Sequence, residues 1–508
     1  MTGPEDPTGA TDCLMTGADY LDSLRDGRQV YIYGEPVKDV TAHPAFRNAA
    51  LSVSRLYDAL HDPATRDVLT TVDHLGQRTH RFFTPSRSAA ELMAAREAIA
   101  CWSRMNYGFM GRSPDYKASF MAGLAANPEF YEPYSDNARE WYRRYASRGL
   151  YLNHVIVNPP IDRKKPVHEM ADVLVHVVRE TDGGIVVSGV KMLATGSAIT
   201  NATFVAQNSA AQLEPGRAED FALVFFAHMD NPGTKLICRS SYEQRAVSPF
   251  DHPLSSRFDE NDAVLVFDNA FIPWEDVLVY RDIERSRAFY AQSGFANRYN
   301  FQSGIRLGVK LDFMSGLISR GAHANGTDEF RGVQASIGEV INIRNTVWAL
   351  TAAMAADPEP GANGTVLPKL EYASAIRMYA TMAWDQIRAL FETTLGGAPL
   401  VVPSSNLDLL NPELRPLIDR YYRGSDSSAE ARVKLFKLVW DAIGGEFGSR
   451  HALYERNYSG NTDQVRLDAL NWARRRGQLA QFEEMVGRCM DDYDLSGWTR
   501  GPWAGPAS

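Results

Sequence analysis

Arginine, tyrosine and proline fall close together in the segment RMNYGFMGRSPDY, residues 104–116. Ser113 can cap a helix that begins at the following proline, because a proline in the first helical position lacks only an N–H group that would have had no partner. Arg112 and Tyr116 would flank the start of that helix, where a guanidinium and a phenol hydroxyl can bind a small polar group. The spacing fits equally well an exposed helix cap in which Arg112 pairs with Asp115, so both interpretations stay open.

A second candidate, His154, stands in the segment LNHVIVNPPIDR, residues 152–163. Histidine changes its protonation near neutral pH, and a well-placed general base accelerates a reaction by about 10²–10⁴-fold. Position alone favours a core histidine that is hydrogen-bonded to backbone at the end of a strand. The remaining histidines include no i, i+4 pair on an evident helix and no H-E-x-x-H motif. The remaining histidines are therefore interpreted as structural or exposed.

Residues that suit a nucleotide cofactor are scattered along the chain. In NPPIDR, residues 158–163, the paired prolines fix an extended turn, and Arg163 offers donors for a phosphate or a ring carbonyl. The same run also fits a rigid connection between two domains, in which Asp162 and Arg163 pair with neighbouring residues. Glycine-containing stretches at 444–448 and 460–463 break helices, and their backbone amides suit a pyrophosphate at the start of a following helix. The sequence contains no Rossmann or P-loop fingerprint.

The elements that must position these residues fall into three regions of different hydrophobic periodicity. Residues 17–150 are mainly helical. Between 151 and 280, short apolar runs alternate with turns, and a mostly antiparallel barrel or sandwich is predicted. Residues 281–496 form an antiparallel bundle of about four long helices. Residues 1–16 are expected to be disordered, and 497–508 form a tail.

Two features of the last region are specific enough to test. Thr327 and Asp328 can cap a long helix whose apolar residues recur at spacings of four, three and seven, which is typical of a bundle. Further long helices are predicted at 370–396, 432–444 and 466–491.

Composition excludes several classes of protein. The chain has 508 residues, 44% hydrophobic and 23% charged, with a formal net charge of −9, which fits a globular enzyme and gives no nucleic-acid footprint. No apolar run is long enough to cross a membrane and no signal peptide is evident, so a cytoplasmic protein is expected. The four cysteines are far apart, which makes a metal site improbable.

The order of helical, β and helical regions resembles the acyl-CoA dehydrogenase-like flavoproteins, an α+β multidomain class. Within it, four segments are similar to the reduced-flavin-dependent aromatic monooxygenases related to the large component of 4-hydroxyphenylacetate 3-monooxygenase. The resemblance covers the chain from Asp19 to about Gly497. The four segments are YGFMGRSPDY (107–116), LNHVIVNPPIDR (152–163), GVKMLATGSA (189–198) and ALYERNYSGNTDQVR (452–466).

This resemblance implies roles for particular residues. Arg112, Tyr116 and His154 would surround a phenol, whose ring reacts faster with an electrophile as the phenolate, and a cation with an imidazole at the oxygen favours loss of the proton. The resemblance also implies contacts with FAD. These involve His154, Pro160, Ile161, Asp162, Arg163, Thr195, Gly460, Asn461, Thr462 and Asp463.

Thr195 has two interpretations. In acyl-CoA dehydrogenase-like proteins a G-x-K strand followed by threonine places the hydroxyl near the reactive ring nitrogen of the flavin, and Gly189, Lys191 and Thr195 fit that spacing. Alternatively, Thr195 ends the hairpin and caps the turn at Gly196.

The resemblance and the missing nicotinamide site together imply the partners. A separate flavin reductase would deliver reduced FAD by diffusion, and O₂ would react with it to give a flavin hydroperoxide that hydroxylates the phenol. Tyr107–Phe109 and the connection 208–218 are candidate covers that keep water from the site. The resemblance also implies a homotetramer, in which the bundle completes a neighbour's site.

The choice of phenol remains open. Free 4-hydroxyphenylacetate, a chlorophenol, tyrosine or a tyrosyl group on a carrier protein would each present a phenol to His154. The connection 208–218 has no evident Ser-Thr pair for a carboxylate, although Arg217 could meet one. This favours a tyrosine-derived substrate of natural-product or antibiotic biosynthesis.

Two other functions compete with hydroxylation. 4-Hydroxybutyryl-CoA dehydratases look similar but need three cysteines and a histidine for an iron–sulfur cluster, and Met105 stands where a partner of Cys101 would be required. The second alternative is a noncatalytic helical-bundle protein that binds flavin or a partner. Conversion of a phenol to a catechol by the protein with reduced FAD and air separates these possibilities.

Overall fold

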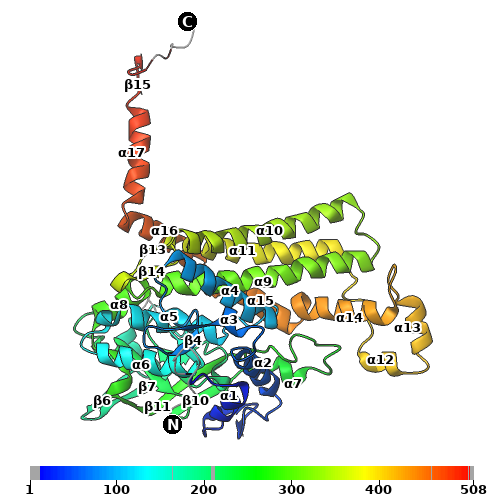
Figure 1. Ribbon diagram of the computed structural model, residues 1–508, viewed down its shortest axis with the longest axis horizontal. Coiled ribbons are helices and arrows are strands. Elements are labelled where there is room, and N and C mark those ends of the chain that lie inside the picture. The colour runs from blue at the N-terminus through cyan, green and yellow to red at the C-terminus, as the bar shows by residue number, and fades with distance from the viewer. Residues whose placement is uncertain are drawn as a thin grey trace.

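The computed structural model describes residues 12–162, 164–207, 212–458, 460, 462–501 and 503, apart from the side chains of residues 118 and 291. Helices of the N-terminal region and two β-sheets form one end of the molecule, and long helices of the C-terminal region extend away from it (Figure 1). The chain therefore combines helical and β regions in the predicted order, helical, then β, then helical, as an α+β protein.

The N-terminal region is mainly helical, as predicted. Ser88 caps one long helix by accepting a hydrogen bond from the backbone of Glu91, and Gly149 ends another in the left-handed conformation, with φ of 66°. The helices are α1 (Gly17–Ser23), α2 (Arg47–Asp58), α3 (Arg66–Leu69), α4 (Ala89–Met105), α5 (Pro114–Ala126) and α6 (Ser135–Arg148). A small hairpin of β3 (Thr70–Val72) and β4 (Arg78–His80), which was not predicted, lies before α4.

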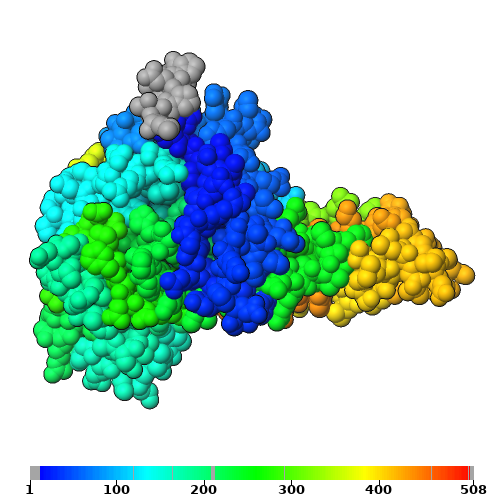
Figure 2. Space-filling view, turned by 90° about the horizontal axis from the view of Figure 1, so that it is seen from below, coloured from blue at the N-terminus to red at the C-terminus, as the bar shows by residue number. Residues whose placement is uncertain are grey.

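The chain start is more ordered than predicted. Residues 1–11 lie outside the described part, but Leu14 and Met15 are buried, and the Met15 N–H donates to the Arg148 carbonyl. Apolar side chains at these two positions pack against the first helices, so disorder does not extend to residue 16. Figure 2 shows the N-terminal segment (blue) lying along the surface beside the β region.

The β region contains two sheets, mostly antiparallel, as predicted. The larger has the order β2-β1-β10-β11-β7-β6 and the smaller β12-β9-β8-β5, with parallel pairing only for β1 with β10 and β5 with β8 among the named strands. The bounds are β1 (Gln29–Ile32), β2 (Glu35–Val37), β5 (Leu152–Val155), β6 (His176–Thr181), β7 (Gly184–Met192), β8 (Ala202–Val205), β9 (Leu223–His228), β10 (Thr234–Cys238), β11 (Ala263–Pro273) and β12 (Val277–Tyr280). The early hairpin β1–β2 lies in the region that was predicted to be mainly helical, yet its strands extend this larger sheet.

The C-terminal region is built around α9 (Phe295–Ala324), whose first half is buried on all sides. It packs on α4, α5, α10 (Arg331–Ala356) and α11 (Leu370–Leu395). Val340, Val347 and Met354 of the predicted apolar stripe are fully buried on α10. The remaining helices are α7 (Tyr242–Arg245), α8 (Ile283–Gln292), α12 (Asn406–Leu410), α13 (Arg415–Tyr421), α14 (Ala429–Val439), α15 (Glu446–Asn457), α16 (Thr462–Arg475) and α17 (Gln478–Met490).

Two predicted features of this region are wrong. Thr327 and Asp328 do not cap α10, because the Thr327 hydroxyl donates to the Ala322 carbonyl and Asp328 bonds to His323, so both complete the turn after α9. The helix predicted over 466–491 is broken at Gly477, which has φ of 72° and separates α16 from α17. Helix α17 projects from the body (Figure 1), while α12 and α13 form a lobe at the far end of the bundle (Figures 1 and 2).

None of the helices in the described residues combines the length and the apolar character needed to span a lipid bilayer.

Candidate active site

Arg112 lies in the loop between α4 and α5, and its backbone is held from both sides. The carboxylate of Glu260 accepts hydrogen bonds from the N–H groups of Gly111 (2.9 Å) and Arg112, and the Tyr151 hydroxyl donates to the Arg112 carbonyl at 2.6 Å. A Cβ at position 111 would lie 2.3 Å from the Tyr454 hydroxyl, so this close approach requires glycine. The loop is therefore fixed by the β region and by α15 together.

The Arg112 guanidinium stacks on aromatic rings and keeps a free donor. Its Cζ lies 4.1 Å from the ring centroid of Tyr116 and 5.3 Å from that of Tyr454. The Nη1 atom is buried and has no hydrogen-bond partner in the described residues. Since a buried unpaired donor is costly, this atom is suited to an oxygen of a bound ligand.

Asp115 rules out the exposed-cap interpretation of this segment. It is fully buried and accepts hydrogen bonds from the Ser113 hydroxyl at 2.5 Å and the Gln302 amide at 3.3 Å, rather than from Arg112. Ser113 does stand before Pro114 at the start of α5, but its hydroxyl donates to Asp115 and does not cap the backbone. Burial raises the pKa of Asp115 to about 6.

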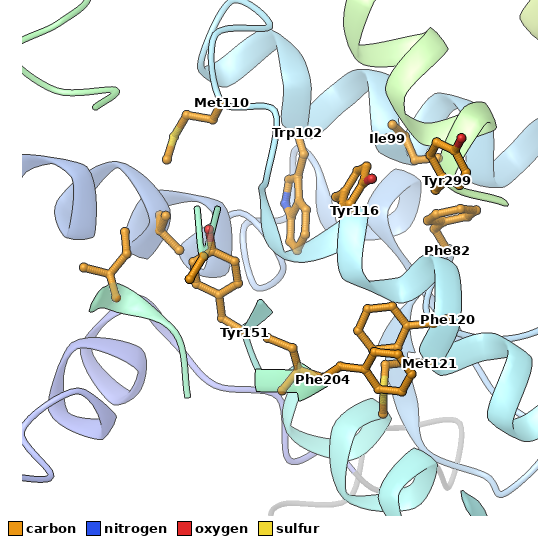
Figure 3. Packing of buried hydrophobic residues seen from close by; sticks show 14 of the residues in the cluster. Phe82, Ile99, Trp102, Met110, Tyr116, Phe120, Met121, Tyr151, Phe204 and Tyr299 are labelled. Atoms are coloured by element: carbon orange, nitrogen blue, oxygen red, sulfur yellow. The ribbon is translucent and has the colours of Figure 1, made fainter. Parts of the chain in front are cut away.

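His154 is half-buried on β5 and faces α5. Its ring stacks on Tyr116 with 5.6 Å between centroids, and the rings of Phe120 and Phe295 meet it nearly at right angles. Figure 3 shows Tyr116 and Phe120 on the same helix, with Phe204 packed against Phe120. The prediction that Arg112, Tyr116 and His154 lie together agrees with these contacts.

The ring nitrogens of His154 have different surroundings. The Lys117 amine lies 3.0 Å from Nδ1, whereas Nε2 has no hydrogen-bond partner among the described residues. Burial lowers the pKa of His154 well below its usual value, and the charges of Lys117 and Arg112 lower it further. The imidazole is therefore neutral, with one nitrogen held and the other available.

A buried ion cluster fixes the far side of the loop. Glu455 on α15 pairs with Arg306 and with Lys310 (3.0 Å), both on α9, and Arg306 also donates to the Gly108 carbonyl at 3.3 Å. Burial alone would raise the pKa of Glu455, but Arg306 and Lys310 lower it to about 2. The cluster ties α9, α15 and the loop together beneath Arg112.

Family models match most of the chain. Residues 16–279 match the model described as 4-hydroxyphenylacetate 3-hydroxylase N terminal, and residues 286–487 match its C-terminal counterpart. The chain belongs to the 4-hydroxyphenylacetate 3-hydroxylase family.

Relatives in this family extend over nearly the whole length. The chain is 65% identical to the pyoverdin chromophore biosynthetic protein PvcC of Pseudomonas aeruginosa, over 97% of this chain and 98% of that protein. It is 48% identical, over 96% of this chain and 92% of that protein, to a Streptomyces globisporus monooxygenase. The name of that enzyme gives its substrate as a 3-amino-3-(3-chloro-4-hydroxyphenyl)propanoyl group on the peptidyl-carrier protein SgcC2.

A solved structure gives the same result. The oxygenase component of 4-hydroxyphenylacetate 3-monooxygenase, in complex with FAD and 4-hydroxyphenylacetate, superposes with a TM-score of 0.88 at 29% identity. The superposition covers 94% of this chain and 99% of that one.

Among the described residues predicted to contact FAD, Pro160 and Ile161 lie on one exposed edge and Gly460 and Asp463 on another, whereas Thr195 is buried and His154 half-buried. Next to β7, Val157 and Ile161 are exposed beside Leu193, and the Met192 N–H donates to the Val157 carbonyl. Leu193 is 59% exposed with φ of 60°, which is uncommon for a residue other than glycine. Exposed apolar side chains at a strained position suit one face of a flavin ring.

Thr195 follows Leu193, the last residue of an exposed apolar strip that also contains Val157 and Ile161. Its hydroxyl donates to Asp262 at 2.6 Å, and Asp262 is held by Arg239 (3.0 Å) and Arg450 (2.9 Å). The alternative in which Thr195 only caps the turn at Gly196 has no support, because its hydroxyl bonds to a carboxylate of another strand connection. Lys191, in the same segment, is buried and donates to oxygens of the Asn158 and Gln207 side chains.

The second edge is at the start of α16. Thr462 is its first residue, and Gly460 has φ of 108° with Arg377 close by, since a Cβ there would lie 3.3 Å from the Arg377 guanidinium. The helix was predicted over 466–491 and begins four residues earlier, at Thr462, so the backbone donors at its start suit a phosphate. Pro160 is exposed, while Asp162 accepts from the Lys164 N–H at 3.1 Å. Arg163 and Asn461 lie outside the described residues.

The connection 208–218 is only partly a polar loop. Residues 208–211 lie outside the described residues, but Leu213 and Ala218 are buried in a small apolar cluster with Phe221. Arg217 is exposed, and its Nη1 atom lies 3.8 Å from Oε2 of Glu214. The described part of this connection, residues 212–218, is therefore anchored by apolar packing.

Sequence reasoning missed three functional candidates. Lys117, Glu260 and Glu455 contact the site from α5, the segment before β11 and α15. The position of Lys117 directly after Tyr116 was the only sequence signal for these candidates. Glu260 and Glu455 reach the site through contacts between residues far apart in the chain. In the described residues no group of three or more His, Cys, Asp or Glu side chains could hold a metal ion.

Proposed function

We propose that this chain is the oxygenase component of a two-component monooxygenase, which uses reduced FAD and O₂ to hydroxylate a phenol ortho to its hydroxyl group. The observation that carries the proposal is that Arg112 and His154 both contact the ring of Tyr116, and that each keeps one polar atom without a partner among the described residues. These atoms are the buried Nη1 of Arg112 and Nε2 of His154. A phenol oxygen fits between a cation and a neutral imidazole. The family membership and the names of the relatives support the same reaction class.

Each residue of the site has a proposed part in this reaction. The phenol ring would pack beside Tyr116, Phe120 and Phe295, the three rings that contact His154, and its oxygen would meet Arg112. His154 accepts the phenol proton at Nε2, and the Arg112 charge stabilises the resulting phenolate. Positioned proton transfer of this kind contributes about 10²–10⁴-fold. The rings also exclude water, which favours transfer of oxygen to the substrate over release of peroxide.

The chain's own residues fit FAD. The strip Val157, Ile161 and Leu193 would pack on the ring, Thr195 would approach its reactive side, and the start of α16 would meet the phosphates. Reduced FAD, when bound, supplies the two electrons that make O₂ an electrophilic oxygen donor. A separate flavin reductase supplies the reduced cofactor, in keeping with the term oxygenase component in the name of the solved relative.

The substrate is proposed to be a tyrosine-derived phenol of natural-product biosynthesis, free or on a carrier protein. The names of the Streptomyces and Pseudomonas relatives support this class. Turnover of free tyrosine, 4-hydroxyphenylacetate and a carrier-bound tyrosyl thioester should be compared under identical conditions. Preference for free 4-hydroxyphenylacetate would contradict the proposed substrate class but not the reaction.

A homotetramer is proposed from the exposed apolar surface of the C-terminal arm. The arm consists of α17 and the strands β15 (Tyr493–Asp494) and β16 (Gly497–Trp498), and no residue of α17 is buried. Phe482, Met485, Val486 and Met490 are each more than half exposed. An amphipathic helix with an uncovered apolar face needs a partner, and a second copy of the chain supplies one.

The reaction is tested by supplying the purified protein with chemically reduced FAD, air and a tyrosine-like phenol. We expect a catechol, detected by mass spectrometry as a gain of one oxygen atom. A protein that binds FAD but yields only peroxide with every phenol would support the noncatalytic flavin-binding alternative instead.

A further inference from the structure

Lys117 occupies an unusual environment on α5, directly after Tyr116. Its side chain is only 1% exposed, and buried lysines are rare unless a carboxylate pairs with them. Among the residues that the structure describes, the Lys117 amine has one hydrogen-bond partner, Nδ1 of His154 at 3.0 Å, and no ion pair. The amine also lies 5.0 Å from the ring centroid of Tyr116, so the lysine contacts the site through the imidazole and through that ring.

The charged groups near Lys117 favour loss of its proton. Burial lowers the pKa of Lys117 well below its ordinary value, and the neighbouring Arg112 charge lowers it further. Glu260 acts in the opposite direction, but its carboxylate is already engaged by the Gly111 and Arg112 backbone N–H groups and by Arg450. A neutral amine has a lone pair that can accept the N–H of a neighbouring imidazole.

Two other buried lysines show what a structural lysine looks like in this fold. Lys191 donates to four oxygen acceptors, among them the side chains of Asn158 and Gln207. Lys310 lies 3.3 Å from Nδ1 of His451 but also pairs with the Glu455 carboxylate at 3.0 Å, which stabilises its charge. Lys117 has neither kind of partner within the described chain.

We infer that Lys117 is the terminal proton acceptor of the site and acts through His154. This inference rests on the proposed hydroxylation of a phenol. The phenol O–H bond breaks as a proton joins Nε2 of His154, while the Nδ1–H bond breaks and that proton joins the Lys117 amine. The products are a phenolate beside Arg112, a neutral imidazole in its other tautomer and a lysine ammonium, so atoms and charges balance.

Transfer of the phenol proton through His154 to Lys117 has a physical advantage over acceptance of the proton by His154 alone. An imidazolium that forms beside Arg112 and the neutral Lys117 amine would be a second positive charge in a buried site, and burial and the Arg112 charge both lower the pKa of His154. An alkyl amine is intrinsically more basic than imidazole, with ordinary pKa values of about 10.4 and about 6.5. Passing the proton on to Lys117 leaves His154 neutral before and after the transfer.

Two substitutions separate proton acceptance from charge and from packing. Lys117→Met keeps much of the volume and removes the amine, whereas Lys117→Arg keeps a positive charge that cannot be lost. Lys434→Met, on the exposed face of α14, is the matched control. Thermal unfolding of each variant, compared with the unaltered protein, establishes that it folds.

The direct readout is the ionisation of a bound phenol, measured without turnover. The probe is 4-nitrophenol, whose phenolate absorbs visible light, added to the protein with anaerobic reduced FAD at a pH below the pKa of the free probe. We expect the unaltered protein and Lys434→Met to bind it as the phenolate. Both Lys117 variants should bind it as the neutral phenol, lose the visible band and require a higher pH to restore it.

Turnover supplies a second readout. We expect kcat/KM with a phenol to fall about 10²-fold in both Lys117 variants, with the rise in activity displaced to higher pH. Retention of the visible band by Lys117→Arg would show that only a fixed charge is needed, and retention by Lys117→Met that the amine has no part; either result overturns the inference. An unaltered protein that hydroxylates phenols yet binds the probe as neutral phenol also overturns it. Failure of the unaltered protein to bind or hydroxylate any phenol would overturn the proposed function as well.

Discussion

The Arg112 guanidinium lies 4.1 Å above the ring of Tyr116 and keeps its buried Nη1 atom without a partner in the described residues. The ring contact fixes the plane of the guanidinium, and the hydrogen bonds to Glu260 and Tyr151 fix the backbone of Arg112. A donor is thus held in place before any substrate arrives. This preorganisation is the feature on which the proposed recognition of a phenol oxygen depends.

Two substitutions of Arg112 should distinguish the effect of its positive charge from the effect of its planar guanidinium group. Arg112→Gln removes the cation beside the phenol oxygen, and we expect kcat/KM to fall about 10²–10³-fold, as for loss of one preorganised donor to a developing anion. Arg112→Lys keeps a charge but not the planar group that stacks on Tyr116, so its activity should be intermediate. Steady-state rates of catechol formation test both, and equal activity of Arg112→Gln and the unaltered protein would remove Arg112 from the mechanism.

His154→Ala should uncouple oxygen consumption from hydroxylation. The imidazole acts on the phenol and not on O₂, so we expect reduced FAD to be oxidised as before while the catechol yield collapses and peroxide appears. Parallel measurement of oxygen uptake, catechol and peroxide distinguishes uncoupling from loss of FAD binding. Full coupling in this variant would show that His154 does not move the proton.

Glu455→Gln should destabilise the whole fold and loosen the site. The substitution leaves Arg306 and Lys310 without a buried counter-charge, which typically costs about 3–5 kcal/mol of unfolding free energy. Denaturant unfolding measures this change. Glu484→Gln, which removes an exposed ion pair with Arg488 on α17, is the control and should alter stability by less than about 1 kcal/mol. Equal effects of both variants would contradict the structural role of the cluster.

Asp115→Asn should stabilise the protein at neutral pH but not in acid. Burial raises the pKa of Asp115 from 3.8 to about 6, so the folded state binds the proton more tightly than the unfolded state. Stability from this group is therefore present below about 3.8 and is lost as the pH rises through about 6. The pKa difference corresponds to about 3 kcal/mol, an upper bound on the gain for the uncharged amide at pH 7.

Unfolding free energies of Asp115→Asn and the unaltered protein should thus converge as the pH falls from about 7 to about 4. A difference between the two proteins that does not change with pH would indicate that Asp115 titrates as an ordinary carboxyl.

Removing the C-terminal arm should change the assembly. We expect a chain ending at Arg476 to have a lower molar mass in light scattering than the full chain, since the exposed apolar residues of α17 are lost. Phe482→Ser with Met485→Ser should weaken assembly in the same direction, whereas Glu483→Gln, a change of a polar neighbour, should not. A full-length chain that is monomeric at all concentrations would refute the proposed tetramer.

Local sequence patterns determined much of the architecture. The apolar stripe of α10 and the strand periodicity after residue 150 depend on neighbours a few positions away, so they can be predicted without a structure. The motifs around Arg112 and His154 likewise identified the family. Periodicity is a property of a single element, which is why these predictions were confirmed, whereas the predicted caps at Ser113 and Thr327 failed because those hydroxyls bond elsewhere.

Only the tertiary structure decided which groups meet in the site. Lys117 and His154 are 37 residues apart, and Glu455 reaches Arg306 and Lys310 across two helices, so no local pattern reports these contacts. The same holds for the hairpin β1–β2, which joins the larger sheet by pairing with β10. Burial and charge pairing are set by elements distant in sequence, and they fix the protonation of a side chain, while the residue type gives only its ordinary pKa.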